Sequence, residues 1–483
     1  MSRSNFIFII ADQMRADCLG TEKRHDIDTP NLDYLATRGS RFSHAYSPCP
    51  SCIPARASMM TGMDPWHAGI LGMGDGQGPI PSDYPHTLAG EFTKAGYQTH
   101  LSGKGHFHPT DCKLGFETIS LDESGRHEVL GREDDYRKWF RENAPAGVTP
   151  GDPGITQNSW MARPWHAAEH LHPSAWTMMD ALEFLKQRDG SRPFFLNISF
   201  ARPHSPYTPP EYYFRSYEGR VKQPIVGDWA AKHDQPGCAV DINAWHGQQS
   251  PRNNALARMG YFGDVSFIDT QIGRLLTTMG RLYREALLNT WFVFVSDHGD
   301  MLGDHHLWRK TYAYEGSSRV PLIIKAPETA GLQQRQVVDE PVALCDIMPS
   351  LLAAADLEIP RTVTGRNLLE CLETSPREWR EYVHGEHDAC YSPEEENQFL
   401  TNGRRKFIWL PRVGLELFFD LEQDPDEMHN LIDDPARAGE IAIWRQRLIC
   451  ELQSRDCGWC SDDELTFTKG PLRSPFLKRR YGG

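Results

Sequence analysis

The sequence predicts an α/β fold with a mainly parallel sheet, followed by a smaller α+β domain. Short runs of β-branched and aromatic residues have the length and composition of buried strands. Helical patterns lie between these runs, and strands that alternate with helices are typical of a parallel sheet. After Leu372 the pattern changes to short antiparallel strands and one helix, which indicates a second, smaller unit.

The elements of the main sheet are predicted from hydrophobic spacing and from capping residues. A first helix is expected at residues 82–95, ending before Gly96, and a second at residues 174–186, with Ser174 as its N-cap. A third helix follows from the helical spacing of Val265, Ile268, Ile272, Leu275 and Met279. The expected parallel strands are residues 6–10, 98–102, 194–199, 291–296 and 320–324.

The remaining segments are expected to be insertions and a C-terminal part. Polar clusters at residues 122–158 and 203–254 look like insertions over one end of the sheet. Late strands are predicted at residues 398–402, 406–410 and 416–420, followed by a helix at residues 441–452. We therefore divide the chain into a main domain (1–373), an α+β subdomain (374–460) and a tail (461–483) that wraps the body or a neighbour.

Composition excludes several classes of protein. The formal charge of −14 is spread along the chain, which argues against nucleic-acid binding and means that an anionic substrate needs a local cationic pocket. The apolar run at residues 6–11 is too short for a signal peptide, and no run approaches the roughly 18 apolar residues of a membrane span. Eleven scattered cysteines, including the pair Cys457 and Cys460, form no disulfide framework. A cytoplasmic location is the simplest interpretation.

Two polar pairs follow predicted strands and are candidate metal ligands. Asp12-Gln13 follows the first strand, and Asp297-His298 follows a later one. Ligands of open parallel sheets bind beyond the carboxyl ends of the strands, so these pairs are expected to meet. Their oxygens favour Ca²⁺, while the imidazole also admits Mn²⁺ or Zn²⁺. Taken alone, either pair is more often a turn or a helix cap.

Residues 51–62, Ser-Cys-Ile-Pro-Ala-Arg-Ala-Ser-Met-Met-Thr-Gly, contain a candidate nucleophile. Pro54 suits the first turn of a helix, which places Cys52 at the N-terminal end, where backbone N–H groups and the helix dipole favour negative charge. Arg56 follows one turn later. A thiol in this setting is activated for nucleophilic attack, although a buried structural cysteine is the alternative.

The pattern Cys-x-Pro-x-Arg with the downstream Thr-Gly closely resembles the signature of the type I sulfatases of the alkaline phosphatase superfamily. The likeness extends in family order through Ile10-Ala-Asp-Gln, Thr29-Pro-Asn-Leu-Asp33, Gly103-Lys-Gly-His106, Arg202-Pro-His204, Ser296-Asp-His-Gly-Asp300 and Phe419-Asp-Leu-Glu-Gln-Asp-Pro-Asp. The resemblance implies an alkaline-phosphatase-like sandwich. It also implies that a maturation enzyme converts Cys52 to Cα-formylglycine, whose hydrate is the nucleophile.

The resemblance also implies a role for each matching residue. The metal ligands are Asp12, Gln13, Asp297, His298 and a hydroxyl of the modified Cys52, around one divalent ion. Gln13 and His298 replace the Asp and Asn of many sulfatases and are more similar to choline sulfatases and phosphonate monoester hydrolases. The implied catalytic set is Cys52, Arg56, Lys104, His106, His204 and Lys310.

These residue types suit the hydrolysis of a sulfate ester. Lys104, Lys310 and Arg56 supply positive charge for the sulfate oxygens in an otherwise acidic protein. His204 or Lys310 is the expected proton donor to the departing alcohol. His106 is the expected base for the step that releases sulfate and regenerates the aldehyde.

The substrate is expected to be a small sulfated sugar or a similar alcohol. Trp308 and Arg309 are candidate rim residues, and Glu386 and His387 are candidate contacts to the leaving group, with ordinary turns as the alternative. One alternative function is phosphonate monoester or phosphodiester hydrolysis at the same site. A second is a non-catalytic binding protein of the same fold, which the intact residue set disfavours. No nucleic acid or membrane partner is expected, and the tail is a candidate contact in a homo-oligomer.

Overall fold

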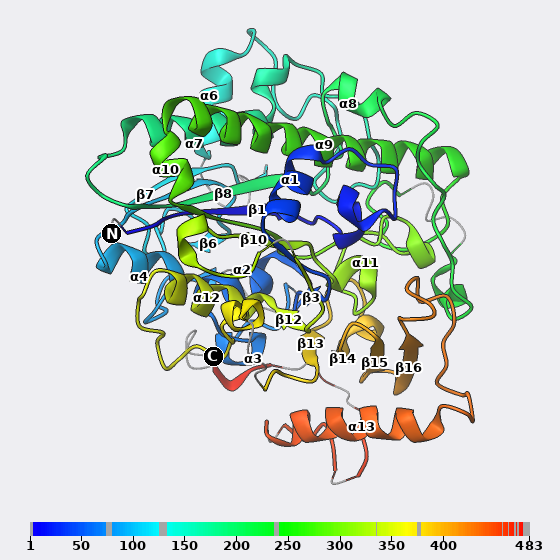
Figure 1. Ribbon diagram of the computed structural model, residues 1–483. Coiled ribbons are helices and arrows are strands. Elements are labelled where there is room, and N and C mark those ends of the chain that lie inside the picture. Colours follow the sequence, from blue (N-terminus) through cyan, green and yellow to red (C-terminus); the bar gives the residue numbers. More distant parts are fainter. Residues whose placement is uncertain are drawn as a thin grey trace.

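The computed structural model describes residues 3–73, 80–124, 133–235, 241–334, 336–373, 378–455, 457–461, 463–467, 470 and 473–476. Figure 1 shows a central sheet with helices on both faces and a smaller C-terminal sheet to one side. In the described part of the chain, none of the helices combines the length and the apolar character that crossing a membrane requires.

The central sheet has eight strands in the order β11-β2-β10-β9-β1-β8-β5-β7. All neighbours run parallel except β10, which is antiparallel to both β9 and β2. The bounds are β1 Asn5–Asp12, β2 Ser40–Phe42, β5 Gln98–Gly103, β7 Thr118–Leu121, β8 Phe194–Pro203, β9 Thr290–Ser296, β10 Leu322–Lys325 and β11 Gln336–Val338.

Four of the five predicted parallel strands are confirmed, and the direction of the fifth was wrong. The strand predicted at residues 320–324 is β10, which pairs antiparallel with β9. If β10 were parallel to β9, the connection would have to cross back along the sheet, usually as a helix. Between β9 and β10 the longest helix is α11 (Glu315–Ser318), a single turn, so the chain reverses instead.

The two cores of the sandwich follow from the alternation of side chains along β1. Phe6, Phe8 and Ile10 pack into one core with α2, α4 and α12, whereas Ile7 and Ile9 pack into the other with α1, α7 and α9. The bounds are α1 Pro30–Arg38, α2 Cys52–Thr61, α3 Pro65–Ala68, α4 Leu88–Lys94, α6 Asp135–Asn143, α7 Pro173–Gln187, α8 Glu211–Arg215, α9 Pro251–Leu282, α10 Arg284–Leu288 and α12 Ile347–Ala354.

The predicted helices exist, with different ends. Helix α4 begins only at Leu88, because Thr87 caps it by accepting a hydrogen bond from the Gly90 N–H. Helix α7 is capped by the ring of His172 rather than by Ser174. Helix α9 extends back to Pro251 and so includes the end of the expected insertion at residues 203–254.

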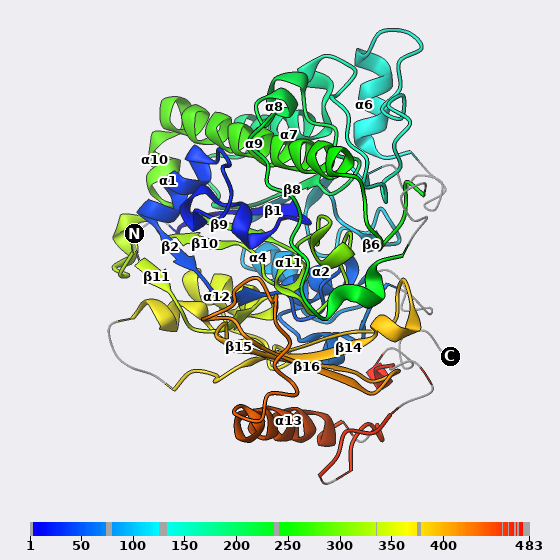
Figure 2. The ribbon, with the colours of Figure 1, turned by 90° about the vertical axis from the view of Figure 1, so that its right-hand side faces the viewer.

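The C-terminal part is an antiparallel sheet with one long helix. Its strands, in order, are β13 Val383–His387, β14 Asn397–Thr401, β15 Arg405–Leu410 and β16 Leu415–Asp420, followed by α13 Ala438–Gln453. The three predicted late strands and the helix are confirmed, and β13 is an additional strand. Figure 2 shows this sheet between the main body and α13.

Small elements complete the fold. Strand β3 (Ala45–Tyr46) pairs with β12 (Val342–Ala343), and β4 (Ile80–Pro81) pairs with β6 (Phe107–His108). In the described part of the tail, the Ser474 hydroxyl donates to the Trp66 carbonyl at 2.6 Å. This short tail segment therefore lies against α3, and much of residues 461–483 lies outside the described residues.

Candidate active site

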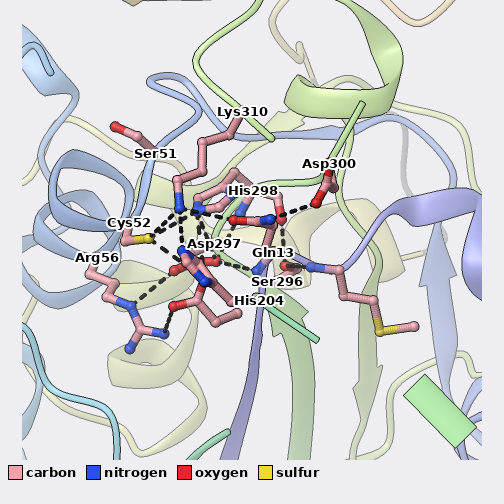
Figure 3. Close-up of polar contacts among 12 residues, drawn as sticks. Gln13, Ser51, Cys52, Arg56, His204, Ser296, Asp297, His298, Asp300 and Lys310 are labelled. Atoms are coloured by element: carbon pink, nitrogen blue, oxygen red, sulfur yellow. Dashed lines mark hydrogen bonds and ion pairs between the residues drawn. The ribbon is translucent and has the colours of Figure 1, made fainter. Parts of the chain in front are cut away.

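The site forms where β1, β9 and α2 meet. Asp12 is the last residue of β1, and Asp297 and His298 directly follow β9, its parallel neighbour. Cys52 is the first residue of α2, and Figure 3 shows the side chains of Cys52, Asp297 and His298 pointing toward one another. The spatial assumption behind the sequence prediction is therefore met: groups from distant segments converge at the carboxyl edge of the sheet.

Four buried side chains present ligand atoms to a common centre. The ligand atoms of Asp12, Cys52, Asp297 and His298 all lie within 4.8 Å of one another. Cys52 Sγ lies 3.1 Å from His298 Nε2 and 3.6 Å from Asp12 Oδ1. His298 Nε2 lies 3.7 Å from the Oδ1 atom of each aspartate. Two carboxylates, an imidazole and residue 52 fit the ligand set of a divalent cation.

Basic side chains hold the outer oxygens of the two aspartates. Arg56 Nε donates to Asp297 Oδ2 at 2.9 Å, and the Lys104 ammonium contacts Asp12 Oδ2. The Oδ1 atoms are therefore the ones that face Cys52 and His298. Burial raises the pKa of Asp12, but the nearby cations, Lys104 foremost and then Arg56, outweigh burial and hold this pKa well below its usual range. Asp12 is thus an ionised carboxylate, as cation binding requires.

The hydrogen bonds of His298 and Gln13 orient both side chains for ligation. His298 Nδ1 donates to the Gly299 carbonyl at 2.9 Å, which leaves the Nε2 lone pair facing the centre. Gln13 Nε2 donates to Asp300 Oδ2 at 2.6 Å, so its Oε1 points the other way, where it accepts from Lys310 Nζ at 2.9 Å. Ligation by Gln13 remains a prediction.

The environment of Cys52 favours its anionic form. Burial and Asp12 raise the pKa of the thiol, but Lys104, Lys310 and His298 outweigh them, and the pKa lies below its ordinary value. The ammonium of Lys310 lies 3.3 Å from Sγ, and that of Lys104 lies 3.9 Å from it. The cations around residue 52 therefore favour negative charge at Sγ.

Lys310 and His204 form a proton-sharing pair beside Cys52. His204 Nδ1 donates to the Ser205 carbonyl at 2.9 Å, so Nε2 is an acceptor and receives a hydrogen bond from Lys310 Nζ at 2.6 Å. Burial, Lys310 and Lys104 lower the pKa of His204 well below its usual range. His204 is therefore neutral at pH 7, and Lys310 is the donor in the hydrogen bond that joins them.

Arg56 acts on the site through other residues. Its Nη1 donates to the Lys104 carbonyl and to Ser199 Oγ, each at 2.8 Å, in addition to the contact with Asp297. Only 1% of the residue is exposed. The guanidinium therefore holds Asp297 and the segment that carries Lys104 in place.

His106 lies on a loop held by a residue that sequence reasoning missed. Glu123 Oε1 accepts from the N–H groups of Gly105 and His106, both at 2.9 Å, and burial raises the pKa of Glu123 to about 7. Neither ring nitrogen of the buried His106 has a hydrogen-bond partner. No hydrogen bond among the described residues joins the ring to Cys52, so its role as a base stays a prediction.

Three of the four expected substrate residues, Trp308, Arg309 and Glu386, lie in different environments. Trp308 is in the hydrophobic core against Trp160, with 1% of its surface exposed, and is not at a rim. Arg309 lies over the Tyr391 ring, 4.6 Å from its centroid. Glu386 is held in an ion pair by Arg455, at 2.5 Å.

His387 reaches the site indirectly. Its Nε2 accepts from Ser51 Oγ at 2.7 Å, because Nδ1 donates to the Asp388 carbonyl. The Ser51 side chain points away from the cluster around Cys52 (Figure 3). The contact of His387 is therefore with the residue before the nucleophile, and a contact with substrate stays a prediction.

Asp300 is a second residue that sequence reasoning left out. The sequence motif that ends in Asp300 assigns roles to Asp297 and His298 but none to Asp300 itself. In the structure this carboxylate accepts from Gln13 and from the Tyr207 hydroxyl, at 2.6 and 2.5 Å. The position of Asp300, two residues after His298, could have pointed to it as a residue of the site. The sequence around Tyr207 contains no such indication.

Comparison with known proteins decides the family. A model described as Sulfatase matches residues 4–357. The chain belongs to the sulfatase family. A further model, for the C-terminal part of N-sulphoglucosamine sulphohydrolase, matches residues 303–454. The resemblance seen in the sequence is thus confirmed, and this sulfatase is a hydrolase.

Relatives and solved structures agree with this assignment. An arylsulfatase from Clostridium perfringens (strain 13 / Type A) is 41% identical over 96% of this chain and 97% of its own length. A choline-sulfatase from Rhizobium meliloti (strain 1021) is 30% identical over 90% of this chain and 83% of its own. The phosphonate monoester hydrolase of Agrobacterium radiobacter has a TM-score of 0.74 at 24% identity, covering 98% and 99% of the two chains. The last likeness confirms the alkaline-phosphatase-like fold.

Proposed function

We propose that this sulfatase hydrolyses the sulfate ester of a small sugar or similar alcohol to the alcohol and inorganic sulfate. The observation that carries the proposal is the buried convergence of Asp12, Asp297 and His298 on Cys52, with Lys104 and Lys310 beside it. Positive charge gathered at one point in an acidic protein supports an anionic substrate group there.

One divalent cation is part of this proposal. Asp12, Gln13, Asp297, His298 and residue 52 would hold it, and the predominance of oxygen ligands supports Ca²⁺ over Mn²⁺ or Zn²⁺. When bound, it would act as a Lewis acid toward the oxygens of the ester. Lys104 and Arg56 hold the outer aspartate oxygens and so keep both carboxylates in place for this ion.

Residue 52 is proposed to work as Cα-formylglycine, made from Cys52 by a maturation enzyme. As its hydrate, this residue would supply a hydroxyl nucleophile and then return to the aldehyde after sulfate leaves. Lys310, 3.3 Å from Sγ and hydrogen-bonded to His204, is placed to give its proton to the departing alcohol oxygen. His106 is proposed as the base for sulfate release.

The proposal also covers the domain division, the tail, the cellular compartment and the residues near the leaving group. The four-strand sheet and α13 support a subdomain at residues 374–460, and the tail at 461–483 is proposed to serve oligomer contacts. Ten cysteines of the described chain are free, which supports a reducing compartment such as the cytoplasm. Arg309 and His387 are proposed to lie nearest the leaving group.

The test is peptide mass spectrometry across residue 52, combined with turnover of 4-nitrophenyl sulfate. Conversion of the thiol to an aldehyde, together with loss of turnover in Cys52→Ala, is the expected result. Full turnover by protein that retains the unmodified thiol would contradict the proposed nucleophile.

Gln13 and His298 favour a second candidate, phosphonate monoester or phosphodiester hydrolysis at the same site. The experiment compares kcat/KM for 4-nitrophenyl sulfate and for a 4-nitrophenyl phosphonate monoester, with the same enzyme preparation. A higher value for the sulfate supports the main proposal, and a higher value for the phosphonate supports the second candidate.

A further inference from the structure

Arg202 is a buried cation whose Nε forms no hydrogen bond in the described part of the chain. It lies in β8, two residues before His204, and only 6% of it is exposed. Its Nε has no hydrogen-bond partner among the described residues. Two buried carboxyls feel its charge: burial raises the pKa of Asp122 and of Asp264, and Arg202 opposes both rises. Leaving a buried donor without a hydrogen bond is costly, so the Arg202 guanidinium is expected to be satisfied by something outside the chain.

Arg202 lines a cavity of about 280 Å³ that is separate from the cluster around Cys52. The cavity lies between the end of β8 and the segment that carries α6, which Figure 1 shows beyond α7 and α9. Tyr136 and Trp165 form aromatic walls, and Ile155 adds an apolar contact. An engineered cavity of about 150 Å³ holds a benzene molecule. The space therefore suits a single ring that carries a small substituent.

The polar groups of the cavity define the chemistry of its ligand. The Arg202 guanidinium is a planar set of donors that matches a carboxylate or sulfate group. The Tyr136 hydroxyl donates to the Leu171 carbonyl at 2.8 Å and is already used. Asp122 Oδ1 accepts from the Ser124 N–H, whereas its buried Oδ2 has no hydrogen-bond partner among the described residues and can accept from a ligand hydroxyl.

We propose that this cavity binds a small ring compound through an acidic group, a carboxylate or a sulfate, that pairs with Arg202. The ring lies between Tyr136 and Trp165, and a hydroxyl of the ligand satisfies Asp122. The acid is either a second acidic group of the enzyme's substrate or a separate small molecule. Binding at this cavity does not depend on the reaction proposed above, because no residue of the cluster around Cys52 lines it.

The probe for the experiment is 4-bromobenzoate, which carries one carboxylate, one ring and an anomalous scatterer. Its affinity is measured by calorimetry with the full-length enzyme, and its position by anomalous diffraction. We expect the carboxylate at Arg202, and binding about 10- to 100-fold weaker in Arg202→Met. Asp122→Asn is expected to tighten binding, because it removes a negative charge while it keeps the shape of the wall.

Lys138→Met is the matched control, since it removes an exposed cation from α6 that does not line the cavity. Its affinity for 4-bromobenzoate should equal that of the wild type. The melting temperature of Arg202→Met is recorded in parallel, so that a loss of binding can be told from a loss of folding. Unchanged affinity in Arg202→Met, or a bromine peak outside the cavity, would overturn the proposal.

Kinetics then separate the two sources of the acid. If 4-bromobenzoate competes with 4-nitrophenyl sulfate, the cavity continues the substrate site, and Arg202 selects substrates with a second acidic group. If both bind together, the cavity takes a separate small acid. Because calorimetry needs no turnover, a failure of the proposed hydrolysis leaves this measurement intact.

Discussion

Asp300 holds four donors at once and thereby orients the site. Besides Gln13 and Tyr207, it accepts from the N–H groups of Leu302 and Arg309, at 2.8 and 2.9 Å. With its NH₂ group bound to Asp300, the amide of Gln13 can present only its oxygen to the centre. A single buried carboxylate thus decides which end of a neighbouring amide is available to a cation.

Asp300→Asn should weaken calcium binding by about 10- to 100-fold, because the variant can no longer hold the Gln13 amide in one orientation. The measurement is a calcium titration of metal-stripped enzyme by calorimetry, with the melting temperature recorded in parallel. Tyr207→Phe serves as the control, since it leaves the Gln13 contact in place. Equal calcium affinity in Asp300→Asn and the wild type would remove Asp300 from this role.

His204→Ala should lower kcat/KM by about 10²- to 10⁴-fold for sulfate esters whose alcohols are poor leaving groups. The loss should be smaller for 4-nitrophenyl sulfate, because its leaving group needs less help from a proton. The check is a series of aryl sulfates with leaving groups of increasing pKa. A uniform loss across the series would show that His204 does not assist the departing group through Lys310.

At the scale of elements, strand β13 clamps the segment that carries the nucleophile. The Glu386 N–H donates to the Pro48 carbonyl at 2.8 Å, and the Asp388 N–H donates to the Leu71 carbonyl at 2.7 Å. Between them, His387 accepts from Ser51 at the start of α2. The C-terminal sheet thus holds Ser51, the residue before Cys52, from 336 residues away in sequence.

His387 should make the enzyme sensitive to acid. Burial lowers the pKa of His387 to about 4 in the folded state, below its ordinary value near 6.5. The unfolded chain therefore binds the extra proton first, and this contribution to stability is lost as the pH falls from about 6.5 toward 4. His387→Gln should unfold with a flatter dependence on pH between about 5 and 6.5. Denaturant titrations at each pH measure this, and parallel curves for the two proteins would contradict it.

At the scale of the whole molecule, a buried lysine joins the C-terminal sheet to the main body. Lys406 of β15 has no exposed surface, and it contacts Glu315 at 2.8 Å and Glu427 at 3.2 Å. One face of the same sheet packs on α13, and the other packs on residues near Tyr312. The two parts are therefore expected to unfold together.

Lys406→Met should lower the free energy of unfolding by about 3–5 kcal/mol, because it leaves buried carboxylates without their cation. Glu427→Gln should cost only about 1 kcal/mol, as burial already raises the pKa of Glu427 to about 7. Calorimetry of both variants provides the measurement. Two separate transitions in the wild type, or equal losses in the two variants, would argue against this link.

The sequence by itself determined the class of fold, the main strands and the residues at the carboxyl edge of the sheet. It could do so because hydrophobic periodicity and motifs such as that around Cys52 are local in the chain. Only the tertiary structure decided the direction of β10, because antiparallel pairing depends on the path of the intervening loop.

The same division holds within the site. The sequence predicted that Asp12, Cys52, Lys104 and Lys310 would lie together, as they do, but it placed Trp308 at a rim instead of in the core. Hydrogen-bond partners such as those of Asp300 are set by packing between segments that are hundreds of residues apart. No local pattern encodes such contacts, and for that reason they appear only in the folded chain.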